Sequence, residues 1–438
     1  MEKLEKINFG NADGKKEARR SNFEALFYDN DGYFEKLSDP DRFLIIGRKG
    51  TGKTLLLEFF KKTMRKKEHT FVGSADVSDF LSVKLHNFDE KEINLEEMTI
   101  FWQYFLLKEF THLILNNEKA IQRMMSKSFK DLKKLDRKLQ TTLQTITASE
   151  SDEFSLGADL EKGGIGGNVQ AKGNETRVMV PAKYYEEFTQ LMDKVNSFIN
   201  STNYSYYLTM DDIDELNSKV KDKETFYYLT IAFINALNKI NDGLWTEKQN
   251  GKVIATLRTD LLDELNIRSD NLSKIIFDCQ ISINWFSSLD REDNPLMKMV
   301  LHKVRASIKE YQEVSDKKLF DKLFPSSPRG VNGFVDYLLK KSFGRPRDIV
   351  YFLRMYVQIF HEDRYFDYKN LNKCVPQYAS FFYQDLENEI NVLSNRSEVL
   401  SLLDLIQRQK VKNFNFEMVH KYYEENKDEF PEIKSSSI

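Results

Sequence analysis

The chain has 438 residues, of which 41% are hydrophobic and 30% are charged, and its formal net charge is −3. This length is enough for two or three domains, and the composition is typical of a soluble protein with a sizeable core. A net charge so close to zero excludes a global basic field that would steer the protein onto DNA or RNA, so any nucleic-acid contact must be local.

Two further features bear on the cellular compartment. The only cysteines, Cys279 and Cys374, lie far apart in the sequence, which argues against a disulfide framework. The chain is charged from its second residue onward, and no later run approaches the ~20 apolar residues that a membrane span needs. We therefore expect a cytoplasmic protein without a membrane segment.

The first part of the chain predicts a strand, a helix and a second strand. Residues 1–40 are polar and predict a helical lead-in. "RFLII" (42–46) is a short apolar run between Asp-Pro and glycines, which is typical of a buried strand. "TLLLEFFKKTM" (54–64) follows at helical spacing, and "HTFVGSADV" (69–77) predicts a second strand.

A long helical region and a glycine-rich stretch come before the next strands. Residues 95–147 predict helix, and the glycines at 155–180 predict a hairpin or mobile loop inserted in the core. Three more strands are predicted at 204–210, 252–258 and 275–285, and helical patterns dominate from about residue 290 onward. This alternation predicts an α/β fold, with a parallel sheet covered by helices on both faces and further helical domains.

The turn after the first strand matches a phosphate-binding motif, G-x-x-x-x-G-K-[ST], without a mismatch. Glycines let the backbone turn tightly so that successive N–H groups point inward at oxyanions, and the following helix adds its partial positive end. We expect Lys53 to reach the β- and γ-phosphates of ATP and act in catalysis, and the Thr54 hydroxyl to hold Mg²⁺. The predicted nucleotide-binding residues of this loop are Gly47, Arg48, Lys49, Gly50, Thr51, Gly52, Lys53 and Thr54. The alternative is an ordinary strand-to-helix connection.

The third predicted strand ends in acids, in the sequence "YYLTMDDIDEL". A phosphate loop needs a second wall that holds the metal and the attacking water. We assign Asp211 to the metal and Asp212 to the water, as a catalytic residue. Asp214 and Glu215 either contribute to the site or cap the next helix. The alternative for the whole segment is a strand end followed by a helix N-cap.

The spacing of these two motifs narrows the class of ATPase. One predicted strand lies between the loop and the acids, and an extra strand between the two motif strands is the mark of the additional-strand P-loop NTPases. The fourth strand ends "ATLRTDLLDEL". In that class a polar residue at this strand tip senses the γ-phosphate, so Thr256, Arg258 and Thr259 are candidates, with Thr256 and Arg258 placed among the nucleotide-binding residues. The alternative is a strand that leaves the core through polar residues.

A helix is predicted in "SFGRPRDIVYFLRMYVQIF", where Pro346 suits the first turn. The residues spaced i, i+3, i+4 and i+7 form an apolar stripe that packs the helix on the core: Ile349, Phe352, Leu353 and Tyr356. Arg345 and Arg347 gain nothing from the dipole at a helix start, so their position favours a nearby external anion.

With Gly47–Thr54, "LTMDDID", "ATLRTD" and "GRPRD" in this order, the chain resembles AAA+/STAND-type ATPases related to initiator and signalling NTPases. It is similar in particular to bacterial stand-alone P-loop ATPases that often sit in defence-related operons. The resemblance covers roughly residues 40–360 and implies a five-strand core, a helical lid and a basic sensor-2 residue, Arg347, as a catalytic residue. It also implies a homo-oligomer in which an arginine of one subunit completes the next site; Arg291 and Arg305 are candidates.

The predicted domains are an N-terminal helical lead-in at 1–40 and an ATPase core at 41–285, whose helical and glycine-rich insertion at about 95–200 departs from a minimal core. A helical lid at 286–360 and a C-terminal domain at 361–438 follow, the latter helical or winged-helix-like.

The basic helix contains Lys127, Lys130, Lys133, Lys134, Arg137 and Lys138. It is either a solvated face or a contact for nucleic acid or a partner. The histidines lack metal-ligand spacing, so no zinc site is predicted.

Two functions remain as hypotheses. The first is a Mg²⁺-dependent ATP-binding and ATP-hydrolysing molecular switch, which the resemblance suggests is the ATPase of an anti-phage defence system. No nuclease, protease or deaminase signature occurs, so a separate effector protein would hold any cutting or toxic activity. The second is a nucleotide-gated scaffold or DNA-binding adaptor with little turnover.

Overall fold

The computed structural model describes residues 2–76, 95–117, 127–138, 176–220, 222–269, 271–325, 333–390, 393, 395–411 and 413–433. The glycine-rich hairpin or loop predicted at 155–180 lies outside the described residues as far as residue 175, and the residues after it are the start of a helix, α9 (Thr176–Ser201).

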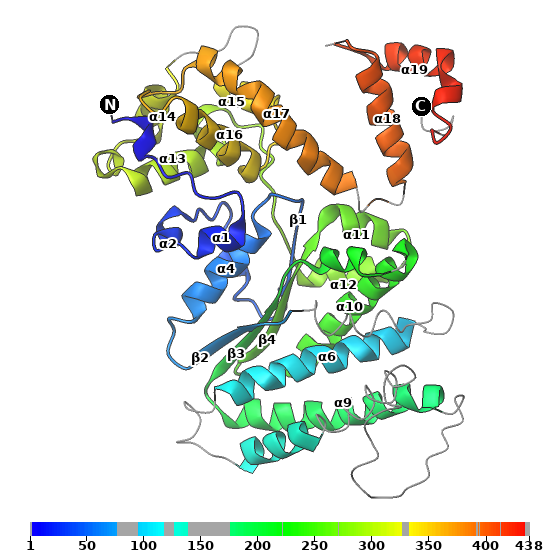
Figure 1. The fold of residues 1–438 in the computed structure, drawn as a ribbon. Helices are drawn as coiled ribbons and strands as arrows, with labels where there is room; N and C mark the ends of the chain where they lie inside the picture. Colours follow the sequence, from blue (N-terminus) through cyan, green and yellow to red (C-terminus); the bar gives the residue numbers. More distant parts are fainter. Residues whose placement is uncertain are drawn as a thin grey trace, which may run out of the picture.

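Five parallel strands form one sheet at the centre of the molecule (Figure 1). They are β1 (Leu44–Gly47), β2 (Thr70–Ser74), β3 (Ser205–Met210), β4 (Gly251–Arg258) and β5 (Gln280–Ser282). Their order in space is β2-β3-β4-β1-β5, and every neighbouring pair is parallel. The α/β fold class is confirmed, and the sheet has an additional strand between the loop strand β1 and the acidic strand β3. That strand is β4, whereas β2, which lies between the two motifs in the sequence, is at the edge of the sheet.

The register of the sheet brings the motif residues to one edge. Gly47 at the end of β1 pairs with Arg258 at the end of β4, and Met210 at the end of β3 pairs with Ala255. Ligands of open α/β sheets bind outside the carboxyl ends of the strands. The phosphate loop, the acids and the β4 tip therefore share the edge where a ligand is expected.

Alternating side chains of the strands enter two separate cores. In β1, Leu44 and Ile46 pack in one core, whereas Ile45 packs in the other. The first core is covered by α6 (Leu95–Asn116), α9, α10 (Lys223–Leu244), α11 (Thr259–Asn266) and α12 (Leu272–Cys279). Both faces of the sheet are therefore buried, which explains why its strands read as continuous apolar runs.

The second core joins the N-terminal segment, the helix after the phosphate loop and the helices of the C-terminal half. It is built from residues 4–9, from α3 (Tyr33–Lys36) and α4 (Lys53–Met64), and from α13 (Pro295–Ser307), α14 (Asp316–Leu323), α15 (Phe334–Leu339), α16 (Pro346–Ile359) and α17 (Tyr368–Ile390). Two further short helices, α1 (Gly14–Ala18) and α2 (Phe23–Leu26), come before α3 in the chain. The stripe predicted on α16 is buried at all four positions. The helices α13 to α17 and one face of the sheet thus share one continuous core.

One predicted strand is wrong over most of its length. Residues 275–279 belong to α12, and only Gln280–Ser282 form β5. Leu272, Ile276 and Cys279 are buried at helical spacing, whereas Phe277 is 72% exposed. A short apolar run fits a buried strand or a helix equally well by periodicity alone, which is why the sequence misled here.

The end of the chain forms a small helical unit. It consists of α18 (Arg396–Arg408) and α19 (Phe416–Glu425), which in Figure 1 stand apart from the sheet beyond α17. Its own apolar cluster contains Leu405, Tyr423, Phe430 and Ile433. No residue in the described part of this tail is in a strand, so the wing of a winged-helix module is not among the described residues. None of the described helices is long and apolar enough to cross a membrane.

Candidate functional site

The phosphate loop runs from the end of β1 into the first turn of α4. Gly50 and Gly52 have φ angles of +84° and +101°, which residues other than glycine rarely adopt. Gly47 is required for space, because a Cβ there would lie 2.5 Å from Thr51 Oγ1. From outside, the Trp285 indole N–H donates to the Thr51 carbonyl at 2.9 Å. The glycines and this contact fix the loop as a tight turn against the helix start.

Lys53 points back into its own loop. Its ammonium donates to the carbonyl oxygens of Gly47 and Arg48 at 2.8 and 3.2 Å. Burial lowers the pKa of the Lys53 ammonium to about 8, and the nearby Asp214 carboxylate opposes part of this shift. The charge is therefore held inside the turn with little water around it.

A cavity of about 450 Å³ lies over the loop. Of the predicted site residues it is lined by Lys49, Gly50, Thr51, Gly52, Lys53, Thr54, Asp212, Arg258 and Arg347. Gly47 and Arg48 do not line it, and the Arg48 guanidinium lies 5.6 Å from the centre of the Phe343 ring. The N-terminal segment adds a wall that sequence reasoning missed, including Asn11, Asp13 and Lys15.

Asp211 and Thr256 lie beside this cavity and do not line it. Asp211 lines an adjoining cavity of about 210 Å³, which also contains Asp212. The buried Thr256 hydroxyl donates to Asp211 Oδ1 and so orients the carboxylate from behind. Thr54 supplies a hydroxyl and the two aspartates supply carboxylates, and such hard oxygen donors fit Mg²⁺, which takes few protein ligands alongside phosphates and water. Thr256 therefore has a positioning role in this arrangement.

Asp212 adopts an unusual backbone conformation, with φ +59° in the left-handed region. Aspartate tolerates this region better than most residues, and such outliers cluster at functional sites. Its Oδ2 lies 2.5 Å from the ammonium of Lys15, which comes from α1. The carboxylate predicted to orient water is thus paired with a cation from a distant segment.

Arg258 is buried at the tip of β4 and held by carboxylates. Its guanidinium donates to Asp214 at 3.2 Å and to Asp260 through both Nε and Nη2. Arg258 also lines the main cavity, so these carboxylates fix its position at the cavity wall.

The start of α16 docks directly on the phosphate loop. The Arg347 backbone N–H donates to the Gly50 carbonyl at 3.3 Å, and a Cβ on Gly50 would lie 2.9 Å from Arg347 Nε. The Arg347 side chain also forms an ion pair with Asp385 of α17. Its buried Nε has no hydrogen-bond partner among the described residues. Arg347 thus lines the cavity while its unpartnered Nε packs against Gly50 of the phosphate loop.

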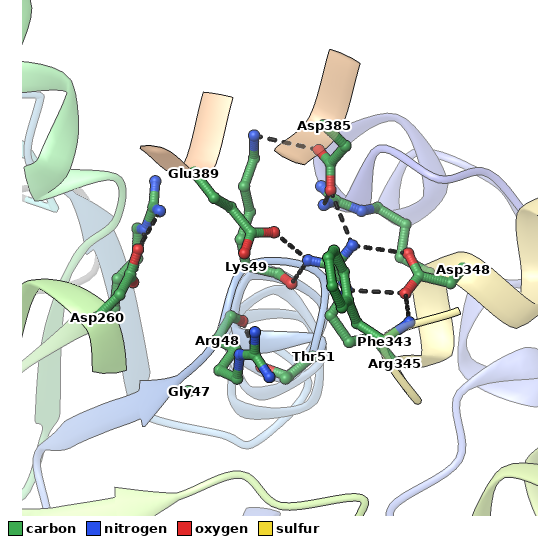
Figure 2. A network of polar contacts seen from close by, with 12 residues as sticks. Gly47, Arg48, Lys49, Thr51, Asp260, Phe343, Arg345, Asp348, Asp385 and Glu389 are labelled. Atoms are coloured by element: carbon green, nitrogen blue, oxygen red, sulfur yellow. Dashed lines mark hydrogen bonds and ion pairs between the residues drawn. The ribbon is translucent and has the colours of Figure 1, made fainter. Parts of the chain in front are cut away.

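Arg345 is buried among carboxylates of its own chain, so no external anion is needed to explain it. Figure 2 shows its guanidinium between Asp348 on one side and Asp385 and Glu389 on the other. It also donates to the Lys49 carbonyl at 3.0 Å, and the Lys49 ammonium lies 3.1 Å from Asp385. The network ties α16 and α17 to the backbone of the phosphate loop.

We expect Asp348→Ala to destabilise the protein by about 2–4 kcal/mol. Asp348 is fully buried and accepts hydrogen bonds from Arg345 and from the Phe343 backbone N–H, so its loss leaves buried donors unpaired. Asp316→Ala, which breaks a half-exposed pair with Arg305, should cost less than about 1 kcal/mol. Urea unfolding of both variants measures the difference, and equal losses would contradict the assigned role.

The two arginines considered for an inter-subunit role have partners within the chain. Arg291 lies 2.5 Å from Asp321, and Arg305 pairs with Asp316. Neither lines the main cavity.

Comparison with known proteins gives one family match, in the C-terminal half. The FunZ-associated C-terminal helical domain matches residues 294–387, which include Arg345, Arg347 and Asp385. No curated protein is detectably similar in sequence.

Two solved structures of Aeropyrum pernix proteins match this chain at low TM-scores. The ORC2 protein in ADPNP–ADP complexes is 12% identical with a TM-score of 0.38, and the alignment covers 90% of this chain and 76% of that one. The ORC1 protein in complex with DNA is 10% identical with a TM-score of 0.34, covering 93% and 86%. Both TM-scores are low, so neither likeness is an argument about this chain.

Proposed function

We propose that the protein is a Mg²⁺-dependent, ATP-binding and ATP-hydrolysing molecular switch of the AAA+/STAND type. One observation carries the proposal: residues 49–54 of the phosphate loop, the acid Asp212 and the lid arginine Arg347 line a single cavity at the carboxyl edge of an additional-strand sheet. Loop, acid and lid cation are the parts that phosphoryl transfer requires.

Binding would exchange contacts within the chain for contacts to the triphosphate. The loop N–H groups and the start of α4 receive the phosphates, and Lys53 turns from the Gly47 and Arg48 carbonyls to phosphate oxygens. Thr54 and Asp211 would hold Mg²⁺, which neutralises charge on the phosphates. Asp212 orients the attacking water and accepts its proton.

The switch would depend on Arg347. The guanidinium of Arg347 pairs with Asp385 of α17, and a γ-phosphate in the cavity would compete for the same group. A ligand shifts a conformational equilibrium only by its different affinity for the two states. If Arg347 exchanges Asp385 for a phosphate, the two states differ in their affinity for the nucleotide. The exchange also removes a contact between α16 and α17, and α17 leads into the C-terminal helices.

A titration of the protein with a nonhydrolysable ATP analogue, with and without Mg²⁺, tests the binding step. Phosphate release from ATP under the same conditions tests turnover. If the protein binds the analogue neither with nor without Mg²⁺, the proposed function is refuted.

The second candidate, a nucleotide-gated scaffold or DNA-binding adaptor with little turnover, is favoured by one observation. Asp212 is paired with Lys15 and Arg347 with Asp385, so two residues assigned to catalysis are engaged elsewhere. Phosphate release with and without DNA, together with filter binding across salt concentrations, separates the candidates. Salt-dependent DNA binding without turnover would favour the adaptor.

The cellular role we propose is anti-phage defence, with a homo-oligomeric ATPase controlling a separate effector protein. This rests on the family resemblance of the motifs and is an association, not a physical inference. The neighbouring genes test it most cheaply, because a housekeeping neighbourhood without a nuclease or toxin gene would count against it.

We expect nucleotide binding to take up a proton through Lys53. Because burial lowers its pKa to about 8 and a triphosphate beside it would raise this pKa, proton uptake should grow as the pH rises through about 8. Affinity should correspondingly fall as the pH rises above 8. Calorimetry in buffers with different ionisation enthalpies measures the uptake.

A control is needed because burial also lowers the pKa of Lys303, another lysine of the cavity, to about 8. The variant Lys303→Met should keep the uptake. If uptake is absent in the wild type, or disappears in Lys303→Met, the assignment to Lys53 is wrong.

A further inference from the structure

One cation of the site comes from the N-terminal segment. Lys15 lies in α1, lines both the main cavity and the adjoining one, and has its ammonium 2.5 Å from Asp212 Oδ2. We propose that Lys15 is a catalytic residue that contacts the γ-phosphate and acts within its own subunit. This inference rests on the proposed ATPase function.

The fold holds the backbone of Lys15 against the first turn of α4. A Cβ on the preceding residue, Gly14, would lie 3.1 Å from both Cβ and Cγ2 of Thr54, so α1 and the metal-binding threonine are in direct contact. The segment is tied to α4 at its far end, where Lys66 lies 2.5 Å from Glu24. It is tied to α16 by Arg354, which donates to Asn11 at 3.0 Å. Contacts with α4 and α16 therefore fix the backbone of Lys15 beside the phosphate loop.

Lys15 differs from the other cations around the cavity in what it pairs with. Arg258 is held by Asp214 and Asp260, and both Lys49 and Arg347 pair with Asp385. None of those three carboxylates is assigned to the reaction. Lys15 alone among these four is paired with Asp212, the residue proposed to orient water.

The ion pair between Lys15 and Asp212 can be replaced readily by an ion pair between Lys15 and a phosphate. The side chains of Lys15 and Asp212 are 54% and 36% exposed, and a lysine ammonium on its four-carbon stem changes partner easily. A triphosphate in the cavity carries more negative charge than one carboxylate and would draw the ammonium toward it. The same movement would release Asp212 for the water and bring a positive charge to the γ-phosphate.

The chemistry of this step is electrostatic. Water attacks the γ-phosphorus, the bond from phosphorus to the β–γ bridging oxygen breaks, and the proton of the water passes to Asp212, giving ADP and phosphate. Lys15 keeps its proton and stabilises the negative charge on the γ-phosphoryl oxygens in the transition state. In this role it replaces a cation that a neighbouring subunit would otherwise supply.

The variants Lys15→Ala, Lys15→Arg and Lys16→Ala test the proposal in the full-length chain. Lys16 is the matched control, because it is the next residue of α1, is 72% exposed and lines neither cavity. An ion pair as exposed as that of Lys15 contributes little to folding, so all three variants should unfold like the wild type. The measurements are steady-state phosphate release and the affinities for ATPγS and ADP.

We expect Lys15→Ala to lower kcat by about 10²–10³-fold with a much smaller change in KM, the loss typical of one electrostatic donor. It should also lower the preference for ATPγS over ADP, which a merely structural role would not change. Lys15→Arg should restore part of kcat and part of the preference for ATPγS over ADP. Lys16→Ala should match the wild type. Wild-type turnover in Lys15→Ala, or a rise in turnover, would overturn the proposal.

Mixing Lys15→Ala with Lys53→Ala protein tests the action within one subunit. If Lys15 served a neighbouring site, the second protein would supply the missing lysine to the first, and activity would return. We expect no recovery, and recovery would refute the assignment to the same subunit. Failure of the wild type to bind ATPγS would instead refute the proposed function.

Discussion

Replacement of Lys53 by alanine is expected to weaken ATP binding by at least about 100-fold. Two charge-assisted hydrogen bonds to phosphate oxygens contribute about 1.5–3 kcal/mol each, and a tenfold change in affinity corresponds to about 1.4 kcal/mol. The effect should be near the upper end, because the ammonium is already buried and loses little further hydration when the nucleotide arrives. Calorimetric or fluorescent-nucleotide titration measures the loss.

The control for this variant is Lys67→Ala, the same substitution at an exposed position just beyond α4. It should bind ATP like the wild type, and thermal unfolding should show that both variants are folded. If Lys53→Ala binds ATP with unchanged affinity, the turn at residues 47–54 is not a phosphate site and the proposed function fails with it.

Replacement of Asp212 by asparagine is expected to preserve nucleotide binding and lower kcat by at least about 100-fold, the range of a lost general base. Asparagine has the same shape and also tolerates the left-handed φ of +59°, so the turn after β3 should remain folded. The amide cannot accept the proton of the attacking water. Single-turnover phosphate release and ATPγS titration separate the two effects.

Asp278→Asn, at an exposed position at the end of α12, is the matched control and should have wild-type turnover. Full activity of Asp212→Asn would remove Asp212 from the mechanism. Loss of nucleotide binding in this variant would instead give Asp212 a binding role.

Local patterns predicted the parts of the site that are contiguous in the chain. The run before Gly47, the glycines of the loop and the helix start at Lys53 depend on residues within a few positions of one another, and the structure has this strand, turn and helix. Pro346 at the start of α16 was predicted for the same reason.

The contacts that the sequence did not reveal join distant segments. The partner of Asp212 is Lys15, almost two hundred residues earlier in the chain, and no motif marks that lysine. Arg345 was interpreted as facing an external anion because Asp385 and Glu389 lie far along the chain in another helix. Charge pairs of this kind depend on tertiary packing, which periodicity and spacing do not encode.

The order of the strands also constrains how the protein is made. Among the described strands, β1 is hydrogen-bonded to β4 and β5 alone, so the strand that carries the phosphate loop has no such neighbour in the sheet until residue 251 and beyond have left the ribosome. Pairings this distant in sequence form slowly, and an unpaired strand edge is prone to aggregation. During synthesis the first half of the chain must therefore wait with its edge exposed, and a fragment ending before β4 should neither fold stably nor hold ATP.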